Sequence, residues 1–331
     1  MKPICLVRTQ LTESTLAQLC NIMQSKCELI ISNGNDYITS GLPHPFTDFQ
    51  LENAEIIIGN PSLDTLSKCK NLKWLQLSSS GADSYANCQY IDRNKTVITN
   101  ATGAYGHAIA EYMVACVMSM TKKLHLYRDN QNNCLWQDMG FVKTINGSNV
   151  LVVGFGDIGG QFAEKMHALG ANIYGIKRTV TDKLGYVISM DTLDKLDSLL
   201  PKMDIVALCL PNSPQTQNII SGKQLELMKK DGILINVGRG NAVDTLALCN
   251  ALSEDKIGGA ILDVTNPEPL PENHPLWKQK NIIITPHISG GYHAAETIEG
   301  IERIILENAK RYVDGRPFIN QVDYNTGYRK K

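Results

Sequence analysis

The chain has 331 residues, of which 43% are hydrophobic and 20% are charged, a composition typical of a folded protein that at this length forms two domains. Its 32 basic and 33 acidic residues nearly cancel and form no long run of one sign, which argues against a broad basic surface for nucleic acid or an anionic membrane. No apolar run reaches the roughly 18 residues that a membrane-spanning helix needs, so we expect no membrane partner.

Nine cysteines are scattered along the chain without a CxxC pair, so the sequence predicts neither a disulfide framework nor a zinc site, and no metal is expected. We interpret them as small buried hydrophobic residues rather than as catalytic groups. The N-terminus lacks the pattern of a secretory signal. Together these features favour a cytoplasmic protein.

The first hundred residues alternate short apolar runs with helical patterns. A helix is expected near 13–24, and the runs are "ICLV", "ELIIS", "AEIIIGN", "LKWLQLS" and "TVIT". Such alternation predicts β/α units on a parallel sheet. An apolar pattern from 106 to 127 then predicts one long helix, which suits an element that crosses between domains or packs on a second subunit.

A second series follows with six apolar runs, "NVLVVGFG", "ANIYGIK", "DIVALCLP", "GILINVG", "GAILDV" and "NIIITPH". Six such runs predict a doubly wound sheet that is buried on both faces. The stretch 293–315 predicts one amphipathic helix that ends at Gly315. We therefore expect an α/β protein with two Rossmann-like or flavodoxin-like domains. The substrate domain would comprise 1–101 and 294–331, and an inserted cofactor domain would comprise 102–293.

The stretch "VVGFGDIGG" has the GxGxxG spacing, directly after an apolar strand and before a helical pattern. In such a turn the first Gly allows a tight bend, the second lets the backbone approach a pyrophosphate, and the third lets helix and strand pack closely. In this context the motif is a strong sign of dinucleotide binding. The residues expected to contact the cofactor here are Gly154, Gly156, Asp157, Ile158 and Gly159.

The stretch "GIKRT" follows the next predicted strand, where NAD-binding proteins usually place an acidic residue on the ribose hydroxyls. Lys177, Arg178 and Thr179 offer hydrogen-bond donors instead of a carboxylate, which suits the 2′-phosphate of NADP. We therefore expect NADP(H) rather than NAD(H). The alternative is that both cations are simply solvated on a loop.

Polar side chains follow three strands of the second series. Arg239 stands between glycines in "NVGRGNAVD", Asp263 and Glu268 lie in "LDVTNPEPLP", and His287 comes directly after a strand and a Pro in "IIITPHISGG". The carboxyl ends of parallel strands meet at one edge of a sheet. An Arg, a Glu and a His gathered there are suited to carboxylate binding and proton transfer.

In this order the motifs resemble those of the D-isomer-specific 2-hydroxyacid dehydrogenase family. The resemblance covers nearly the whole chain, through "SSSGAD", "VGFGDIG", "LPNSPQT", "NVGRG", "PEPLP", "HPLW" and "TPHISGG". It implies an enzyme that passes hydride between a nicotinamide cofactor and a D-2-hydroxy acid or 2-oxo acid. Two departures are the missing acidic cofactor residue and Thr265, which stands where the family frequently has an aromatic residue.

The resemblance also implies roles for single residues. Arg239 would bind the substrate carboxylate and polarise the carbonyl, because its planar fork makes two bonds. His287 would be the general acid–base beside the nicotinamide, and Glu268 would orient its imidazole and favour the protonated form. Backbone N–H groups of Ser80 and Gly81 would bind the same carboxylate.

For the cofactor, the resemblance implies that Asp263 bonds the nicotinamide carboxamide and that Pro211 and Thr216 line the adenosine pocket. It also implies a homodimer that forms through the predicted helix at 106–127. We expect reduction of a small 2-oxo acid such as glyoxylate or hydroxypyruvate.

Three alternatives remain at this stage. A dinucleotide sensor without enzymatic activity could keep the same fold, and a phosphoglycerate-dehydrogenase-like enzyme could use NAD. Formate dehydrogenation is disfavoured, because members with that activity pair the histidine with an amide, where this chain has Glu268.

Overall fold

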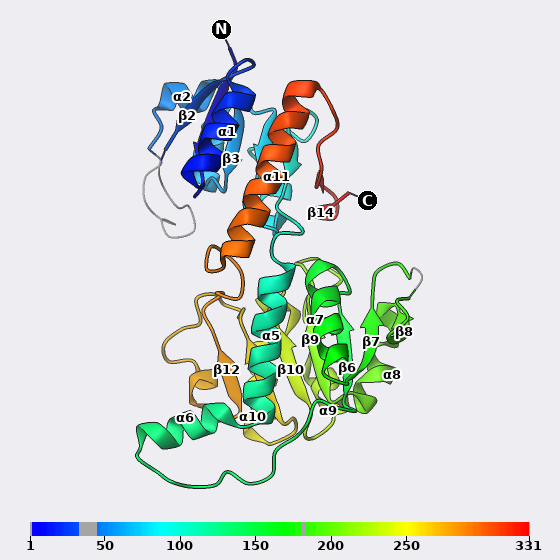
Figure 1. The fold of residues 1–331 in the computed structure, drawn as a ribbon. Coiled ribbons are helices and arrows are strands. Elements are labelled where there is room, and N and C mark those ends of the chain that lie inside the picture. The colour runs from blue at the N-terminus through cyan, green and yellow to red at the C-terminus, as the bar shows by residue number, and fades with distance from the viewer. Residues whose placement is uncertain (1, 33–44, 181–182, 331) are drawn as a thin grey trace. The chain divides into compact units, whose positions relative to one another are not determined.

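The computed structural model describes residues 2–32, 45–180 and 183–330, and the chain divides into two compact units (Figure 1). The first unit comprises Met1–Tyr105 and Gly291–Lys331, and the second comprises Gly106–Gly290. Both are α/β units built on a parallel sheet, so the predicted fold class is confirmed. In the described ranges, no helix is both long and apolar enough to span a bilayer.

The first unit contains a five-stranded sheet in the order β2-β1-β3-β4-β5, with every pair parallel. All five strands were predicted, and they are β1 (Ile4–Arg8), β2 (Glu28–Ile31), β3 (Ala54–Gly59), β4 (Trp74–Gln76) and β5 (Val97–Thr99). Its helices are α1 (Glu13–Met23), α2 (Asp48–Asn53), α3 (Leu63–Ser67), α4 (Asp83–Ala86) and α11 (Ala295–Asp314). The order is that of flavodoxin-like folds, in which ligands bind beyond the carboxyl ends of the strands.

The last helix of the chain, α11, ends as predicted at Gly315, which adopts a left-handed conformation with φ 67°. It is joined to the sheet through a buried amide, because Asn308 donates to Gln76 at 2.7 Å and accepts from the Ile319 N–H at 2.9 Å. A short antiparallel pair, β13 (Val322–Asp323) and β14 (Tyr328–Arg329), closes the unit. The C-terminal segment is therefore part of the first unit.

The second unit contains a seven-stranded parallel sheet in the order β12-β11-β10-β9-β6-β7-β8. The strands are β6 (Asn149–Val153), β7 (Asn172–Ile176), β8 (Val187–Asp191), β9 (Ile205–Leu208), β10 (Ile233–Asn236), β11 (Gly259–Leu262) and β12 (Ile282–Ile284). Six were predicted. The sequence gives little sign of β8, because this edge strand buries only its first residue fully. The order reverses between β6 and β9, where doubly wound proteins bind ligands.

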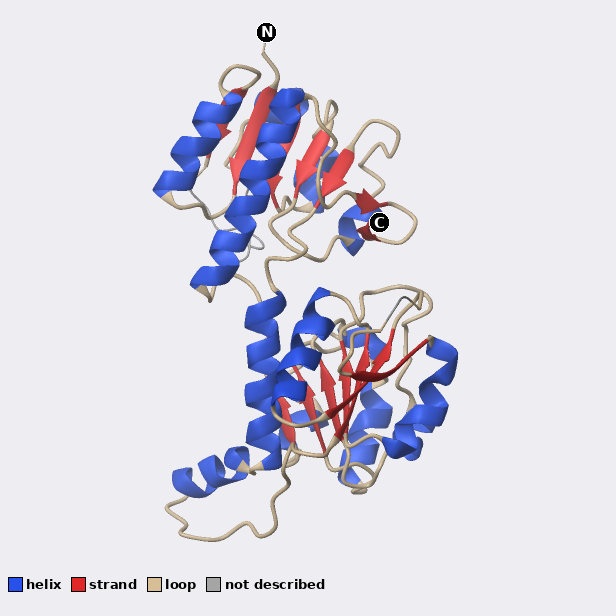
Figure 2. Cartoon of the chain, turned by 45° about the vertical axis from the view of Figure 1, so that its right-hand side comes forward, coloured by secondary structure: helices blue, strands red, loops and turns tan. Residues whose placement is uncertain are grey.

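Helices cover both faces of this sheet (Figure 2). The helices of this unit are α5 (Gly106–Thr121), α6 (Leu124–Asn132), α7 (Asp157–Ala168), α8 (Leu196–Leu199), α9 (Gly222–Leu227) and α10 (Thr245–Ser253), of which α6 projects away from the sheet. Short 3-10 turns lie at Leu193–Lys195, Leu200–Lys202, Gly240–Ala242 and Pro275–Lys278.

The prediction of one helix over 106–127 was wrong, because the helix is interrupted between α5 and α6. Lys123 adopts a left-handed conformation with φ 58°. The amines of Lys122 and Lys123 bond the carbonyls of Lys143 and Met139, at 2.6 and 2.5 Å. These bonds to the segment 139–143 favour a turn at a point where the apolar pattern alone predicts that the helix continues.

Candidate active site

The glycine-rich turn after β6 has the geometry of a phosphate cradle. A side chain at Gly154, which has φ 99°, would place its Cβ 2.5 Å from the Cys209 carbonyl oxygen, and one at Gly159 would overlap the Gly154 carbonyl. At Gly156, by contrast, no atom of the described residues lies within 4 Å of that position, and none of their side chains caps the N-terminus of α7. The uncapped N–H groups and the open approach fit a pyrophosphate.

The two other residues of the motif begin α7. Asp157 is exposed, and its carboxylate lies against Gly106 at the start of α5, where a Cβ would be 2.7 Å from Oδ1. Ile158 is half-buried in the first turn. The acid therefore lies against the start of α5, and a side chain at Gly106 would require the Asp157 carboxylate to move.

The two cations of "GIKRT" follow β7. Lys177 is half-buried, whereas Arg178 and Thr179 are exposed. The Lys177 N–H donates to the Asp191 carbonyl at 2.9 Å, which ties the turn to the end of β8. Sequence reasoning did not consider this contact with Asp191, since β8 itself was missed.

The loop after β9 contains Pro211 and Thr216. Thr216 is buried, and its hydroxyl donates to the Pro211 carbonyl at 2.7 Å and accepts from the Ser213 N–H at 3.0 Å. Pro211 is half-buried. Thr216 therefore stabilises the conformation of this loop through hydrogen bonds to the loop backbone.

Arg239 is presented by a turn that only glycines could form. A Cβ at Gly238 would overlap the Leu210 carbonyl oxygen, and one at Gly240 would overlap the backbone of Thr265. The loops after β9, β10 and β11 consequently touch through their backbones. Between the two glycines, Arg239 is half-buried, and its Nη1 donates to the Gly238 carbonyl at 2.9 Å.

His287 and Glu268 form a close pair at the same edge of the sheet. The Nδ1 atom of His287 lies 2.6 Å from Oε1 of Glu268. This hydrogen bond lowers the pKa of Glu268 below its usual value, against the effect of burial, and the charge of Arg239 lowers it further. The structure thus brings the three predicted side chains into one electrostatic neighbourhood. Because a carboxylate only accepts, Nδ1 carries the proton and Nε2 is left for a substrate.

Asp263 follows β11 and is buried. One of its carboxylate oxygens accepts from the Thr285 hydroxyl at 2.6 Å and from the Ile288 N–H at 2.9 Å. The other accepts from the N–H and the hydroxyl of Ser289, at 3.0 and 2.5 Å. These four bonds use the lone-pair sites of a carboxylate, so Asp263 here holds the loop that carries His287. Sequence reasoning missed Thr285 and Ser289, although both hydroxyls flank the histidine in "ITPHIS".

Ser80 and Gly81 follow β4 in the first unit and are half-buried. Their carbonyls are fixed, because Asn100 donates to Ser80 at 2.7 Å and the Ser79 hydroxyl donates to Gly81 at 2.8 Å. Within the described ranges the N–H groups of Ser80 and Gly81 donate to no other group. These N–H groups could therefore bind an anion.

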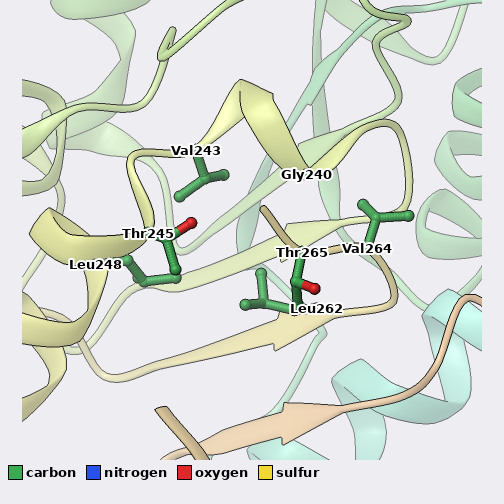
Figure 3. Close-up of a pocket in the computed structure, with 7 residues that line it drawn as sticks. All are labelled: Gly240, Val243, Thr245, Leu248, Leu262, Val264 and Thr265. Carbon is green, nitrogen blue, oxygen red and sulfur yellow. The ribbon is translucent and has the colours of Figure 1, made fainter. Parts of the chain in front are cut away.

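A small cavity beside the Arg239 turn is no ligand site. It measures about 10 Å³, room for roughly one water molecule, and Figure 3 shows the residues that line it: Gly240, Val243, Thr245, Leu248, Leu262, Val264 and Thr265. In the part of the chain that the structure describes, no group of three or more His, Cys, Asp or Glu side chains could hold a metal ion.

Several known proteins are similar to this chain in sequence or in structure. The family model described as D-isomer specific 2-hydroxyacid dehydrogenase, NAD binding domain, matches residues 114–289. A glyoxylate reductase of Thermofilum pendens is 33% identical over 248 residues, which cover 73% of this chain and 71% of that protein. A glycerate dehydrogenase of Methylorubrum extorquens is 27% identical and covers 85% and 90%. The crystal structure of a D-isomer specific 2-hydroxyacid dehydrogenase family protein from Aeromonas salmonicida is 28% identical, covers 98% and 100%, and gives a TM-score of 0.82.

Proposed function

This chain belongs to the D-isomer specific 2-hydroxyacid dehydrogenase family and is an NAD(P)-dependent oxidoreductase of small 2-hydroxy and 2-oxo acids, and we propose that Arg239, Glu268 and His287 carry out its reaction. The observation that supports these roles best is the 2.6 Å pair of His287 with Glu268, whose pKa Arg239 also lowers. An acid–base pair beside a guanidinium is what reduction of a 2-oxo acid requires.

In the reaction we propose, the guanidinium of Arg239 binds the substrate carboxylate with two bonds and polarises the carbonyl group. His287 donates the proton on Nε2 to the carbonyl oxygen, and Glu268 keeps Nδ1 protonated and stabilises the charged imidazole. The nicotinamide, when bound, supplies the hydride. Its pyrophosphate would be held by the turn at 154–159 and by the first N–H groups of α7.

For the substrate we propose glyoxylate or hydroxypyruvate. Relatives named glyoxylate reductase and glycerate dehydrogenase support this choice. On the family's pattern, the N–H groups of Ser80 and Gly81 would bind the substrate carboxylate, and Pro211 and Thr216 would border the adenosine. Asp263 would reach the carboxamide only by giving up one of its present bonds, such as that from the Ser289 hydroxyl.

A steady-state assay of NADPH and NADH oxidation against a panel of 2-oxo acids tests this function. We expect turnover with at least one short 2-oxo acid. The rival function, a dinucleotide sensor without chemistry, predicts cofactor binding with no oxidation of either nucleotide in the presence of any member of the panel.

We propose NADP(H) as the preferred cofactor, because Lys177, Arg178 and Thr179 offer donors to a 2′-phosphate. Combining Lys177→Asp with Arg178→Ala is expected to shift the ratio of kcat/KM for NADPH over NADH by roughly 100-fold or more toward NADH, since the two charge-assisted hydrogen bonds that are lost each contribute about 1.5–3 kcal/mol. Cofactor kinetics at saturating 2-oxo acid measure this ratio. The exposed Lys202→Asp, before β9, controls for a general effect of charge. An unchanged ratio would show that the two cations do not select the cofactor.

We also propose that the protein is a homodimer, with the segment 124–142 in the interface. This segment exposes large apolar side chains, with Trp136 at 105% and Phe141 at 87% of full exposure, together with Leu124, Leu135 and Val142. Exposed apolar side chains gathered on one segment are typical of a contact surface.

Light scattering tests the dimer. Combining Trp136→Glu with Phe141→Glu is expected to halve the mass in solution, because it places charge in an apolar interface. The control is Phe49→Glu, at a 66% exposed aromatic residue of the first unit. A wild-type protein with the mass of one chain would contradict the dimer.

A further inference from the structure

The loop that carries His287 depends on contacts from outside its own strand. His287 has φ 55°, a left-handed conformation that is strained for a residue with a side chain and persists only where the surroundings enforce it. The His287 N–H donates to the Asp263 carbonyl at 2.8 Å, and the Asp263 carboxylate receives its four bonds from the same loop. Asp263 is therefore the centre of the contacts that hold the imidazole in place.

Helix α5 reaches this loop from one face of the sheet. It packs on β11, since a Cβ at Gly259 would lie 2.9 Å from the sulfur of Met120 near the end of the helix. About two turns earlier, Tyr112 lies at the other end of the strands, and its hydroxyl is 2.6 Å from the Thr285 hydroxyl. Tyr112 is half-buried, and burial raises the pKa of its phenol, so it remains protonated over the range in which enzymes work.

The direction of these bonds follows from the groups involved. The Asp263 carboxylate can only accept, so the single hydroxyl proton of Thr285 is donated to Asp263 at 2.6 Å. The Tyr112 hydroxyl must then be the donor to Thr285. The result is a chain of bonds from Tyr112 through Thr285 to Asp263, in which each bond strengthens the next.

We propose that Tyr112 is a positioning residue for His287, which acts through Thr285 and Asp263 to set the loop in the conformation that proton transfer needs. Its kinetic consequence depends on the proposed function, but its structural consequence does not. Removal of the Tyr112 hydroxyl leaves the Thr285 oxygen without its donor and loosens the support of the left-handed histidine.

The first test observes the imidazole directly. In protein labelled with carbon-13 at histidine, the His287 resonance is assigned by its loss in His287→Gln. We expect Tyr112→Phe to shift or broaden this resonance. Tyr324→Phe is the matched control, because it also removes a half-buried tyrosine hydroxyl, which bonds the Thr96 carbonyl at 2.7 Å in the first unit. An unchanged His287 signal in Tyr112→Phe would overturn the proposal.

The second test is a double-mutant cycle on turnover. Tyr112→Phe is expected to lower kcat by roughly 2- to 10-fold, the effect of one net hydrogen bond, with an unchanged KM for the 2-oxo acid. In a Thr285→Val background the same change should have no further effect, since the chain is already broken there. Thr285→Ser should restore the dependence on Tyr112.

Failure of the role of Tyr112 and failure of the proposed function give different results. An equal loss from Tyr112→Phe in both backgrounds would show that Tyr112 does not act through Thr285 and would overturn the proposal, even if Thr285→Val is less stable. A wild-type protein inert toward every 2-oxo acid would instead contradict the proposed function, and the His287 resonance would still decide the role of Tyr112.

Discussion

Replacing His287 with Asn is expected to lower kcat by roughly 10²- to 10⁴-fold, the contribution of a positioned general acid–base. The reason is that the imidazole is the group that can hold a proton on Nε2 while Glu268 fixes Nδ1 at 2.6 Å. An amide keeps a donor but cannot give up a proton at neutral pH. Steady-state kinetics measure kcat, and fluorescence titration with NADPH should show that the cofactor still binds.

His293→Asn is the matched control for this change. His293 is exposed, has no role in the proposed site, and lies six residues further along the chain. Its replacement should leave kcat within about twofold, in line with a surface substitution. If His287→Asn turned over at the wild-type rate, another group would have to be the acid.

Replacing Arg239 with Lys is expected to lower kcat/KM for the 2-oxo acid by roughly 100-fold or more, although the charge is retained. Lys cannot make the two parallel bonds with which Arg binds a carboxylate, and loss of a donor to the reacting carbonyl alone costs about 10²- to 10³-fold in rate. The turn between Gly238 and Gly240 is fixed by backbone contacts, so the shorter reach cannot be corrected by a shift of the chain. KM for the substrate should rise while KM for the cofactor stays unchanged.

The control here is Arg303→Lys, an exposed position on α11. It should change neither constant. A wild-type KM and kcat in Arg239→Lys would show that a single positive charge suffices, and that the forked geometry of the guanidinium is not used.

Most of the fold could be predicted because the pattern of apolar residues along the chain indicates which positions are buried. Strands such as β9 and β10 are buried at every position, and a continuous apolar run of that length is typical of a parallel sheet. The edge strand β8 lacked this signal. The break after α5 was missed for another reason, since it depends on bonds from Lys122 and Lys123 to carbonyls some 16 to 21 residues away.

Residues of the candidate site could be predicted where a reactive polar side chain follows the end of a strand. Arg239, Glu268 and His287 stand out because apolar packing would not select them, and the structure places Glu268 against His287. Tyr112 could not be found in this way, because a tyrosine in an apolar helix is as compatible with packing as with a hydrogen bond. Its partner Thr285 is 173 residues away, so the pair exists only in the folded chain.

The most direct measurement supplies NADPH deuterated at the transferable position of its nicotinamide together with hydroxypyruvate and analyses the product. We predict glycerate of the D configuration with one deuterium on C2. L-glycerate, product without the label, or no consumption of NADPH or NADH with hydroxypyruvate, glyoxylate or any other short 2-oxo acid would contradict the proposed reaction.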